Sequence, residues 1–188
     1  MTRPRRNGFL LLELLVALAV ALVLVGQIAQ ATLQDTGQAR RLGRLLRERL
    51  VAQQALELIR AELQQALEVQ LTLPAAGHGD CGLSGRLVRL HLLTAAGRIT
   101  YSVENRPDAI WRGKALMRCG PTYGLDGQLN ASTNESRVLV DALAEAGLTV
   151  QPGALGLSLG LIRRFDDHQG AAQVVSSTLT TPASGFRP

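Results

Sequence analysis

The hydrophobic and polar positions divide the chain into two parts with different patterns. From Leu14 to Val25 no polar side chain occurs, whereas the residues after about Thr72 mix polar and apolar positions as a domain in water does. A helix over residues 9–33 would be about 37 Å long, which exceeds the roughly 30 Å hydrocarbon core of a bilayer. The pattern therefore predicts a membrane-spanning helix at 9–33.

The helical pattern continues beyond the apolar run but becomes amphipathic. Leu56, Ile59 and Leu63 recur at spacings of three and four residues, and Ala66 or Leu67 continues this apolar stripe. Because no proline occurs between residues 9 and 73, we predict a single long helix whose amphipathic half covers 34–72. The charged and polar residues expected on its other faces are Arg60, Glu62, Gln64 and Glu68.

Strand-like segments follow a glycine-rich break at 74–85. The segments 86–93 and 98–104 predict a hairpin joined through 94–97, and further strands are expected at 115–119, 137–140, 157–165 and 173–179. The stretch 120–136 is predicted to be a long polar loop, and His91, which alternates with two leucines, is expected on a solvated strand face. A long helix packed on an antiparallel sheet is an α+β arrangement, with the β-rich domain at 73–188.

A specific motif precedes the apolar run. The segment NGFLLLELLVALAV, residues 7–20, resembles the prepilin signal of type IV pilins and type II secretion pseudopilins, which combines a basic leader, a Gly-Phe junction and a Glu at fixed distance. The resemblance implies that a prepilin peptidase cleaves between Gly8 and Phe9, removes the leader 1–8, and leaves Phe9 to be N-methylated. It also implies a pilin fold, and weaker likenesses at 99–101, 116–118 and 138–140 resemble larger minor pilins and J-type pseudopilins.

Glu13 is an acidic residue inside this apolar run. An ionised Asp, Lys or Arg at a helix centre in lipid costs roughly 2.5–3.5 kcal/mol on insertion scales. Cleavage would free a cationic amine on Phe9, and opposite charges about 4 Å apart attract by roughly 4 kcal/mol at an effective dielectric constant of 20. The resemblance implies that Glu13 pairs with the Phe9 amine of an adjoining subunit and sets its axial register. The alternative is that Glu13 simply reaches the lipid headgroups.

The filament interpretation implies a set of partners and a location. The expected partners are a prepilin peptidase, other pilins or pseudopilins, an inner-membrane assembly platform and the lipid bilayer. The expected location is the inner membrane, with a single span and a periplasmic domain, and then a pilus or pseudopilus. Two other fates of the N-terminus stay open: an uncleaved anchor, or a conventional signal peptide cut after Ala31, which would release a secreted soluble binding protein.

Charge does not by itself indicate a nucleic-acid partner. The formal net charge is +5, and loss of the three leader arginines would leave +2. The arginines from Arg40 to Arg49 surround the helix, and no aromatic residues are interleaved with them. This pattern favours a neck that contacts water or lipid headgroups over a nucleic-acid site. A nucleic-acid-binding component for DNA uptake is retained as an alternative. Arg40 to Arg49 also make the distal flank more basic than the leader, against the positive-inside rule. A cytoplasmic leader is still favoured because an N-terminal signal enters the export machinery first.

Cys81 and Cys119 are the only cysteines, and they predict a disulfide in an oxidising compartment. Such a bond would close a loop of about 39 residues and contribute about 4 kcal/mol in the chain-entropy model. Two reduced thiols, or a metal site formed by Cys81 and His78, are the alternatives. A single Cys-His pair lacks the usual zinc spacing, so neither a metal nor a cofactor is expected.

No motif of a known catalytic type occurs in the chain. The sequence contains no G-x-S-x-G, Walker loop or H-E-x-x-H, so an enzyme is not expected. The run Asp166-Asp167-His168 is predicted to form a polar turn. Calcium binding at this run is the alternative, but the ligand spacing is incomplete.

Overall fold

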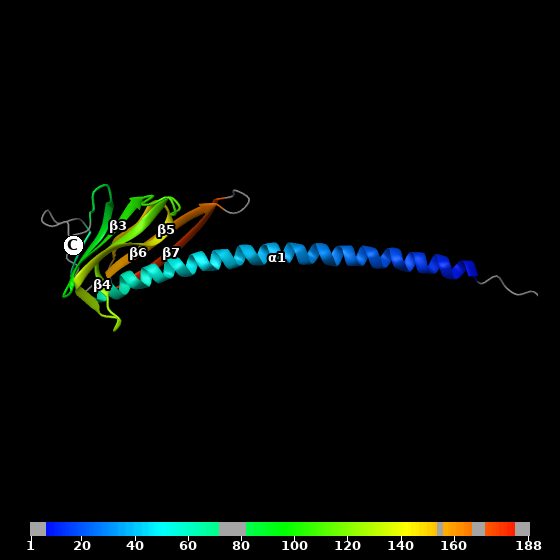
Figure 1. Ribbon diagram of the computed structural model, residues 1–188, viewed down its shortest axis with the longest axis horizontal. Helices are drawn as coiled ribbons and strands as arrows, with labels where there is room; N and C mark the ends of the chain where they lie inside the picture. Colours follow the sequence, from blue (N-terminus) through cyan, green and yellow to red (C-terminus); the bar gives the residue numbers. More distant parts are fainter. Residues whose placement is uncertain (1–6, 72–81, 154–155, 167–171, 183–188) are drawn as a thin grey trace, which may run out of the picture. The chain divides into compact units, whose positions relative to one another are not determined.

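The computed structural model describes residues 7–71, 82–153, 156–166 and 172–182, and within the helix it describes the side chains of 11–30, 39 and 41–65. One helix, α1 (Asn7–Gln65), precedes seven strands (Figure 1). The strands are β1 (Ala66–Gln70), β2 (Leu87–Thr94), β3 (Gly97–Asn105), β4 (Lys114–Tyr123), β5 (Leu129–Gly153), β6 (Gly156–Asp166) and β7 (Ala172–Thr181). The chain forms two compact units, Met1–Leu46 and Arg47–Pro188.

The first unit contains the apolar part of α1. The segment Leu11–Gln30 has a mean hydropathy of 2.5, and all of its side chains are exposed. Its 20 residues are long and apolar enough to cross a membrane. A helix of this kind at the N-terminus serves either as a membrane anchor or as a signal sequence.

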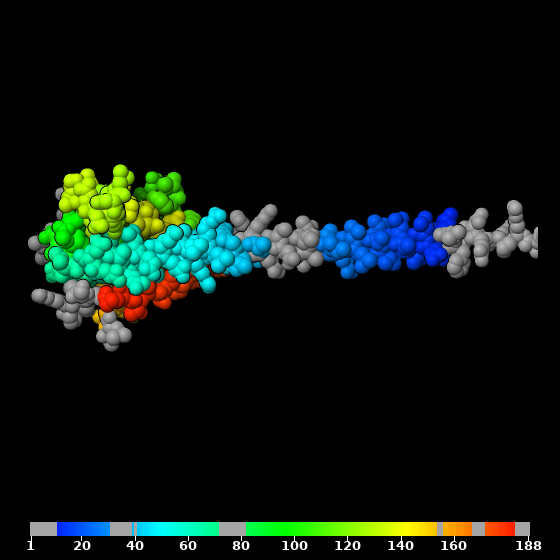
Figure 2. Space-filling model, turned by 90° about the horizontal axis from the view of Figure 1, so that it is seen from below, coloured from blue at the N-terminus to red at the C-terminus, as the bar shows by residue number. Residues whose placement is uncertain are grey.

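The second unit is a helix packed on a sheet. Seven antiparallel strands lie in chain order from β1 to β7, and the part of α1 after Leu46 lies against one face of this sheet (Figure 1). In Figure 2 this helical segment, in cyan, has β7, in red, along one side. The arrangement is compatible with the predicted α+β class. Its buried helix stripe consists of Ala52, Ala55, Leu56, Ile59 and Leu63, each at most 5% exposed.

The amphipathic half of α1 ends earlier than the predicted residue 72. The helix ends at Gln65, and residues 66–70 form strand β1, which pairs antiparallel with β2. Ala66 and Val69 are both buried and lie three residues apart, which is also the spacing of apolar residues along the helix. Their spacing therefore predicted a continued helix, although they belong to a strand. Pairing with β2 decides that residues 66–70 form a strand and not a helix, and the spacing of apolar residues contains no information about that pairing.

Most predicted strands are confirmed. The hairpin of β2 and β3 turns through Ala95 and Ala96, because Thr94 pairs with Gly97. The expected loop at 120–136 is wrong: β4 continues to Tyr123, and β5 begins at Leu129. This hairpin end is polar because residues 130–136 are all exposed, so its strands lack the alternation of a half-buried sheet.

His91 was expected on a solvated face, and this prediction is wrong. Only 5% of its surface is exposed, and its Nδ1 lies 2.8 Å from the Thr100 hydroxyl. Strand β2 is flanked by β1 and β3, so Gln70 and Thr100 lie beside His91 in the register. Burial, together with the nearby charge of Arg98, lowers the pKa of His91 and favours its neutral form.

Candidate assembly site and ion-pair anchors

The predicted processing and assembly residues lie at the start of α1. Gly8 and Phe9 belong to its first turn, and Glu13 lies four residues after Phe9. Residues four apart lie on the same side of a helix, so the backbone brings Phe9 and Glu13 to one face. The Glu13 side chain is exposed and forms no ion pair with any described side chain.

Glu13 is the only charged residue in the segment Leu11–Gln30. Its neighbours Leu12 and Leu14 are 63% and 70% exposed. A carboxylate on such a surface is costly in lipid, and a cation supplied by a neighbouring molecule would lower that cost. The geometry therefore permits lateral pairing of Glu13 with a charge outside this chain.

A second group of charges, the neck anchor, holds the start of the second unit's helix to the sheet. It consists of Glu48, Arg112, Asp141 and Arg163. Arg163, which is 1% exposed, donates from Nη1 to the Glu48 backbone oxygen at 2.9 Å and lies 2.6 Å from Glu48 Oε2. Its Nε donates to the Asp141 backbone oxygen at 2.9 Å, and Nη2 lies 3.2 Å from Asp141 Oδ1. One guanidinium from β6 therefore joins α1 to β5.

Arg112 completes the neck anchor from the loop between β3 and β4. Its Nη2 and Nε donate to the two Asp141 carboxylate oxygens at 2.9 and 3.0 Å, and Nη1 donates to Glu48 Oε1 at 3.2 Å. Burial alone would raise the pKa values of Glu48 and Asp141, but hydrogen bonds from Arg112 and the charges of Arg112 and Arg163 outweigh it. Both carboxyl pKa values are therefore lowered, and both groups are charged near neutral pH.

A third group, the central cluster, lies deeper under α1. Glu62 is completely buried and accepts hydrogen bonds from Arg118 Nε at 2.7 Å, from the Tyr123 hydroxyl at 2.8 Å and from the Tyr101 hydroxyl. Arg118, which is 1% exposed, also donates from Nη2 to the Pro121 backbone oxygen at 2.9 Å. Burial and the Glu62 carboxylate raise the pKa values of both tyrosines, so the hydroxyls stay protonated and donate.

Sequence reasoning missed both clusters. Glu62 was expected on a face away from the core, yet it lies on the buried stripe one turn after Ile59. The signal was available, because Glu48 and Glu62 both fall on the three-and-four spacing that contains Ala52 and Ile59. A carboxylate on a buried apolar stripe needs a basic partner close to it. The strands provide Arg163 for Glu48 and Arg118 for Glu62.

The predicted disulfide and metal alternatives fall partly outside the described residues. Cys119, in β4, is disulfide-bonded, while Cys81 and His78 lie outside the described residues. Asp166 ends β6, and its predicted neighbours Asp167 and His168 also lie outside. Within the described ranges, no group of three or more His, Cys, Asp or Glu side chains could hold a metal ion.

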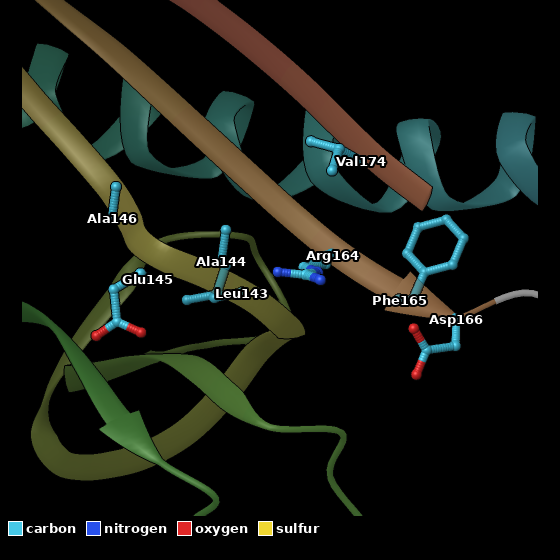
Figure 3. A pocket seen from close by; sticks show the side chains of 8 residues that line it. All are labelled: Leu143, Ala144, Glu145, Ala146, Arg164, Phe165, Asp166 and Val174. Carbon is cyan, nitrogen blue, oxygen red and sulfur yellow. The ribbon is translucent and has the colours of Figure 1, made fainter. Parts of the chain in front are cut away.

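A groove of about 690 Å³ opens where β5 leaves the ladder with β6 (Figure 3). Leu143 pairs with Arg163 and Leu148 pairs with Leu161, so four residues of β5 stand opposite one residue of β6. The resulting bulge exposes a mixed surface. Its lining residues are Leu143, Ala144, Glu145, Ala146, Arg164, Phe165, Asp166 and Val174.

No family model, curated protein or solved structure matches the chain.

Proposed function

We propose that the chain is a structural subunit of the type IV pilin class, either a minor pilin or a type II secretion pseudopilin. A prepilin peptidase cleaves it between Gly8 and Phe9, and the new Phe9 amine is methylated. The mature subunit stays in the inner membrane through α1 with its sheet domain in the periplasm. An assembly platform then adds it to, or uses it to start, a pilus or pseudopilus of related subunits.

Glu13 carries the proposal. It is the single charged residue of Leu11–Gln30, it lies four residues after the Gly8–Phe9 junction, and it is exposed on the helix. In the assembled filament, Glu13 binds the Phe9 amine of an adjoining subunit, and the exposed apolar side chains pack laterally. Both charges are then compensated, which relieves the cost that each has in lipid alone.

The second unit supports the proposal more generally. A domain displayed from a packed helix must stay attached to that helix. Three arginine and carboxylate pairs attach it here: Glu48 pairs with Arg112 and Arg163 in the neck anchor, and Glu62 pairs with Arg118 in the central cluster. A seven-stranded sheet is larger than usual for pilins.

The N-terminus of the mature protein tests the processing step. We expect Edman sequencing and intact mass to give N-methylated phenylalanine at residue 9 in protein isolated from its native membrane. A start at Thr32 would instead identify a secreted protein released by signal peptidase, and a start at Met1 would identify an uncleaved anchor. Either result contradicts the proposal.

A Glu13→Ala variant tests the assembly step. We expect normal membrane insertion, because loss of a charge lowers the cost of insertion. Incorporation into filaments is expected to fall at least about tenfold, which corresponds to about 1.4 kcal/mol of lost pairing energy. Leu15→Ala, at a position 56% exposed on the same helix, removes apolar packing area but no charge, so it is the matched comparison and its loss of incorporation should be clearly smaller. Equal incorporation of Glu13→Ala and unaltered protein would refute the role of Glu13.

A further inference from the structure

Strand β7 lacks the features by which proteins protect the edge of a sheet. Each of the other six strands contains at least one ionisable side chain, but β7, with the sequence AQVVSSTLTT, contains none. It pairs with β6 along all ten of its residues without a bulge, and it contains no proline. Natural edge strands are commonly short, bulged, charged or covered, because a long regular edge accepts foreign strands.

The opposite edge of the same sheet is protected. Strand β1 has only five residues, it carries the acidic Glu68, and its register with β2 shifts between Ala66 and Glu68. All three features hinder the addition of another strand. The sheet therefore protects its β1 edge and leaves its β7 edge without these features.

The outward side of β7 has no strand neighbour among the described residues, and several of its side chains are exposed. Among the described strands β7 contacts only β6, so its outward N–H and C=O groups have no strand partner in that part of the chain. Its side chains alternate, and Val174, Ser176 and Thr178 are exposed while Val175 is buried. In Figure 2 the red atoms of β7 lie along one margin of the folded unit.

We infer that β7 is a docking edge that accepts an extended segment of a different protein subunit as an eighth strand. Backbone hydrogen bonds would supply the affinity, and alternate side chains would supply the specificity. Because β7 has no charge to neutralise a partner's charge, the matching segment is uncharged and rich in serine, threonine and valine. Val174 also lines the groove of Figure 3, so the exposed face of β7 borders that groove.

A different subunit fits this edge better than a second copy of the chain. The β1 edge of a second copy is too short and is acidic. Two β7 strands meeting about a twofold axis would reverse one domain relative to the other. Such a reversal does not suit subunits that share one orientation in a membrane, and this step of the inference rests on the proposed function.

A peptide tests the docking edge directly. The probe is KSVTVSVTVSVK, an alternating valine and serine or threonine strand that is not a copy of β7, with one lysine at each end for solubility. It carries a fluorophore and is titrated into the full-length protein in detergent. We expect saturable binding and slower hydrogen exchange of β7 amides, with no change in β1. Thr178→Lys places a charge on the edge and should weaken binding at least tenfold. Leu67→Lys, at an exposed position on β1, is the matched control and should bind normally.

Three results would overturn the inference. The first is unchanged hydrogen exchange of the β7 amides at saturating peptide, and the second is equal peptide binding by Thr178→Lys and the unaltered protein. The third is a dimer of the full-length chain that Thr178→Lys abolishes, because that result would identify a second copy as the occupant. Thermal unfolding of Thr178→Lys verifies that the variant is folded. Peptide binding does not depend on cleavage after Gly8, so an unexpected mature N-terminus with intact binding would contradict only the proposed function.

Discussion

Glu62 and Arg118 form an ion pair that is buried on both sides, and such a pair fixes a position more than it adds stability. Removing either charge from water costs several kcal/mol, and the hydrogen bonds from both tyrosines and to Pro121 offset that cost only when all partners are present. The pair therefore specifies which turn of α1 lies over β4. A helix shifted by one turn would leave Arg118 charged and without its carboxylate.

Glu62→Ala is expected to destabilise the folded unit by about 3–5 kcal/mol, because it leaves Arg118 buried and unpaired. Chemical denaturation of the full-length protein in detergent measures this free energy of unfolding. Glu57→Ala removes the exposed pair with Arg60 and should cost no more than about 0.5 kcal/mol. The double change Glu62→Leu with Arg118→Met removes both charges and should recover most of the loss. If the double variant is no more stable than Glu62→Ala, the buried charge is not the cause.

The neck anchor predicts a loss of stability in acid. The carboxyl pKa values of Glu48 and Asp141 are lowered in the folded protein from reference values of 4.5 and 3.8. The folded state therefore binds fewer protons than the unfolded state, so the stabilising contribution is complete above about pH 5 and is lost as the pH falls through the lowered pKa values. We expect the free energy of unfolding to decrease between pH 5 and pH 3.

Arg112→Met serves as the comparison for that pH series. It removes the principal hydrogen-bond donor to both carboxyl groups, so their pKa values should return toward the reference values. The variant should be less stable at pH 7 and should lose less stability on acidification. A pH dependence equal to that of the unaltered protein would exclude the neck anchor as the source.

At the scale of elements, the sequence predicted those strands and hairpins whose conformation is determined by residues close to one another in the chain. The β2–β3 hairpin follows from two alternating runs separated by a short turn, and β6 follows from its apolar residues at every second position. Strand β1 and the polar end of the β4–β5 hairpin were missed, because their conformation depends on pairing with strands elsewhere. Polar strands exposed on both faces carry no periodic signal of their own.

Gly156 controls how β7 ends against β6. Its φ is +135°, and an added Cβ would lie 2.2 Å from the Thr181 backbone oxygen. Gly156→Ala must therefore strain the backbone and displace the end of β7, at an expected cost of about 2–4 kcal/mol. Gly82→Ala, where a Cβ meets nothing within 4 Å, is the control for thermal unfolding. Equal melting temperatures for the two variants would contradict the importance of this contact.

At the scale of the whole molecule, the sequence predicted the apolar helix and the sheet domain but not how they are joined. Glu13 and Phe9 were identified from a motif contiguous in sequence, whereas Glu48 and Arg163 are 115 residues apart. The chain contains 15 acidic and 20 basic residues, and a single sequence does not indicate which acid forms an ion pair with which base. Only the register of β6 under α1 brings those two residues together.

The boundary of the second unit predicts which truncations remain folded. A chain beginning at Arg41 retains the neck anchor and is expected to be soluble and folded, since it lacks Leu11–Gln30. A chain beginning at Gln53 lacks Glu48, leaves Arg163 without its main partner, and should melt at least about 10 °C lower. Circular dichroism on heating measures both. Equal melting temperatures would mean that the helix is held without Glu48.

The order of the strands also has a consequence for how the protein matures. Every strand pairs with its neighbour in the sequence, so hairpins can form one after another as the polypeptide is synthesised. The contact between Glu48 and Arg163 instead closes over most of the chain, and it cannot exist until β6 has been delivered. A growing chain can therefore form the Glu62–Arg118 pair as soon as β4 is made, but the helical turn around Glu48 stays without Arg163 until β6 follows. A product terminated before β6 would expose that turn to quality-control proteases.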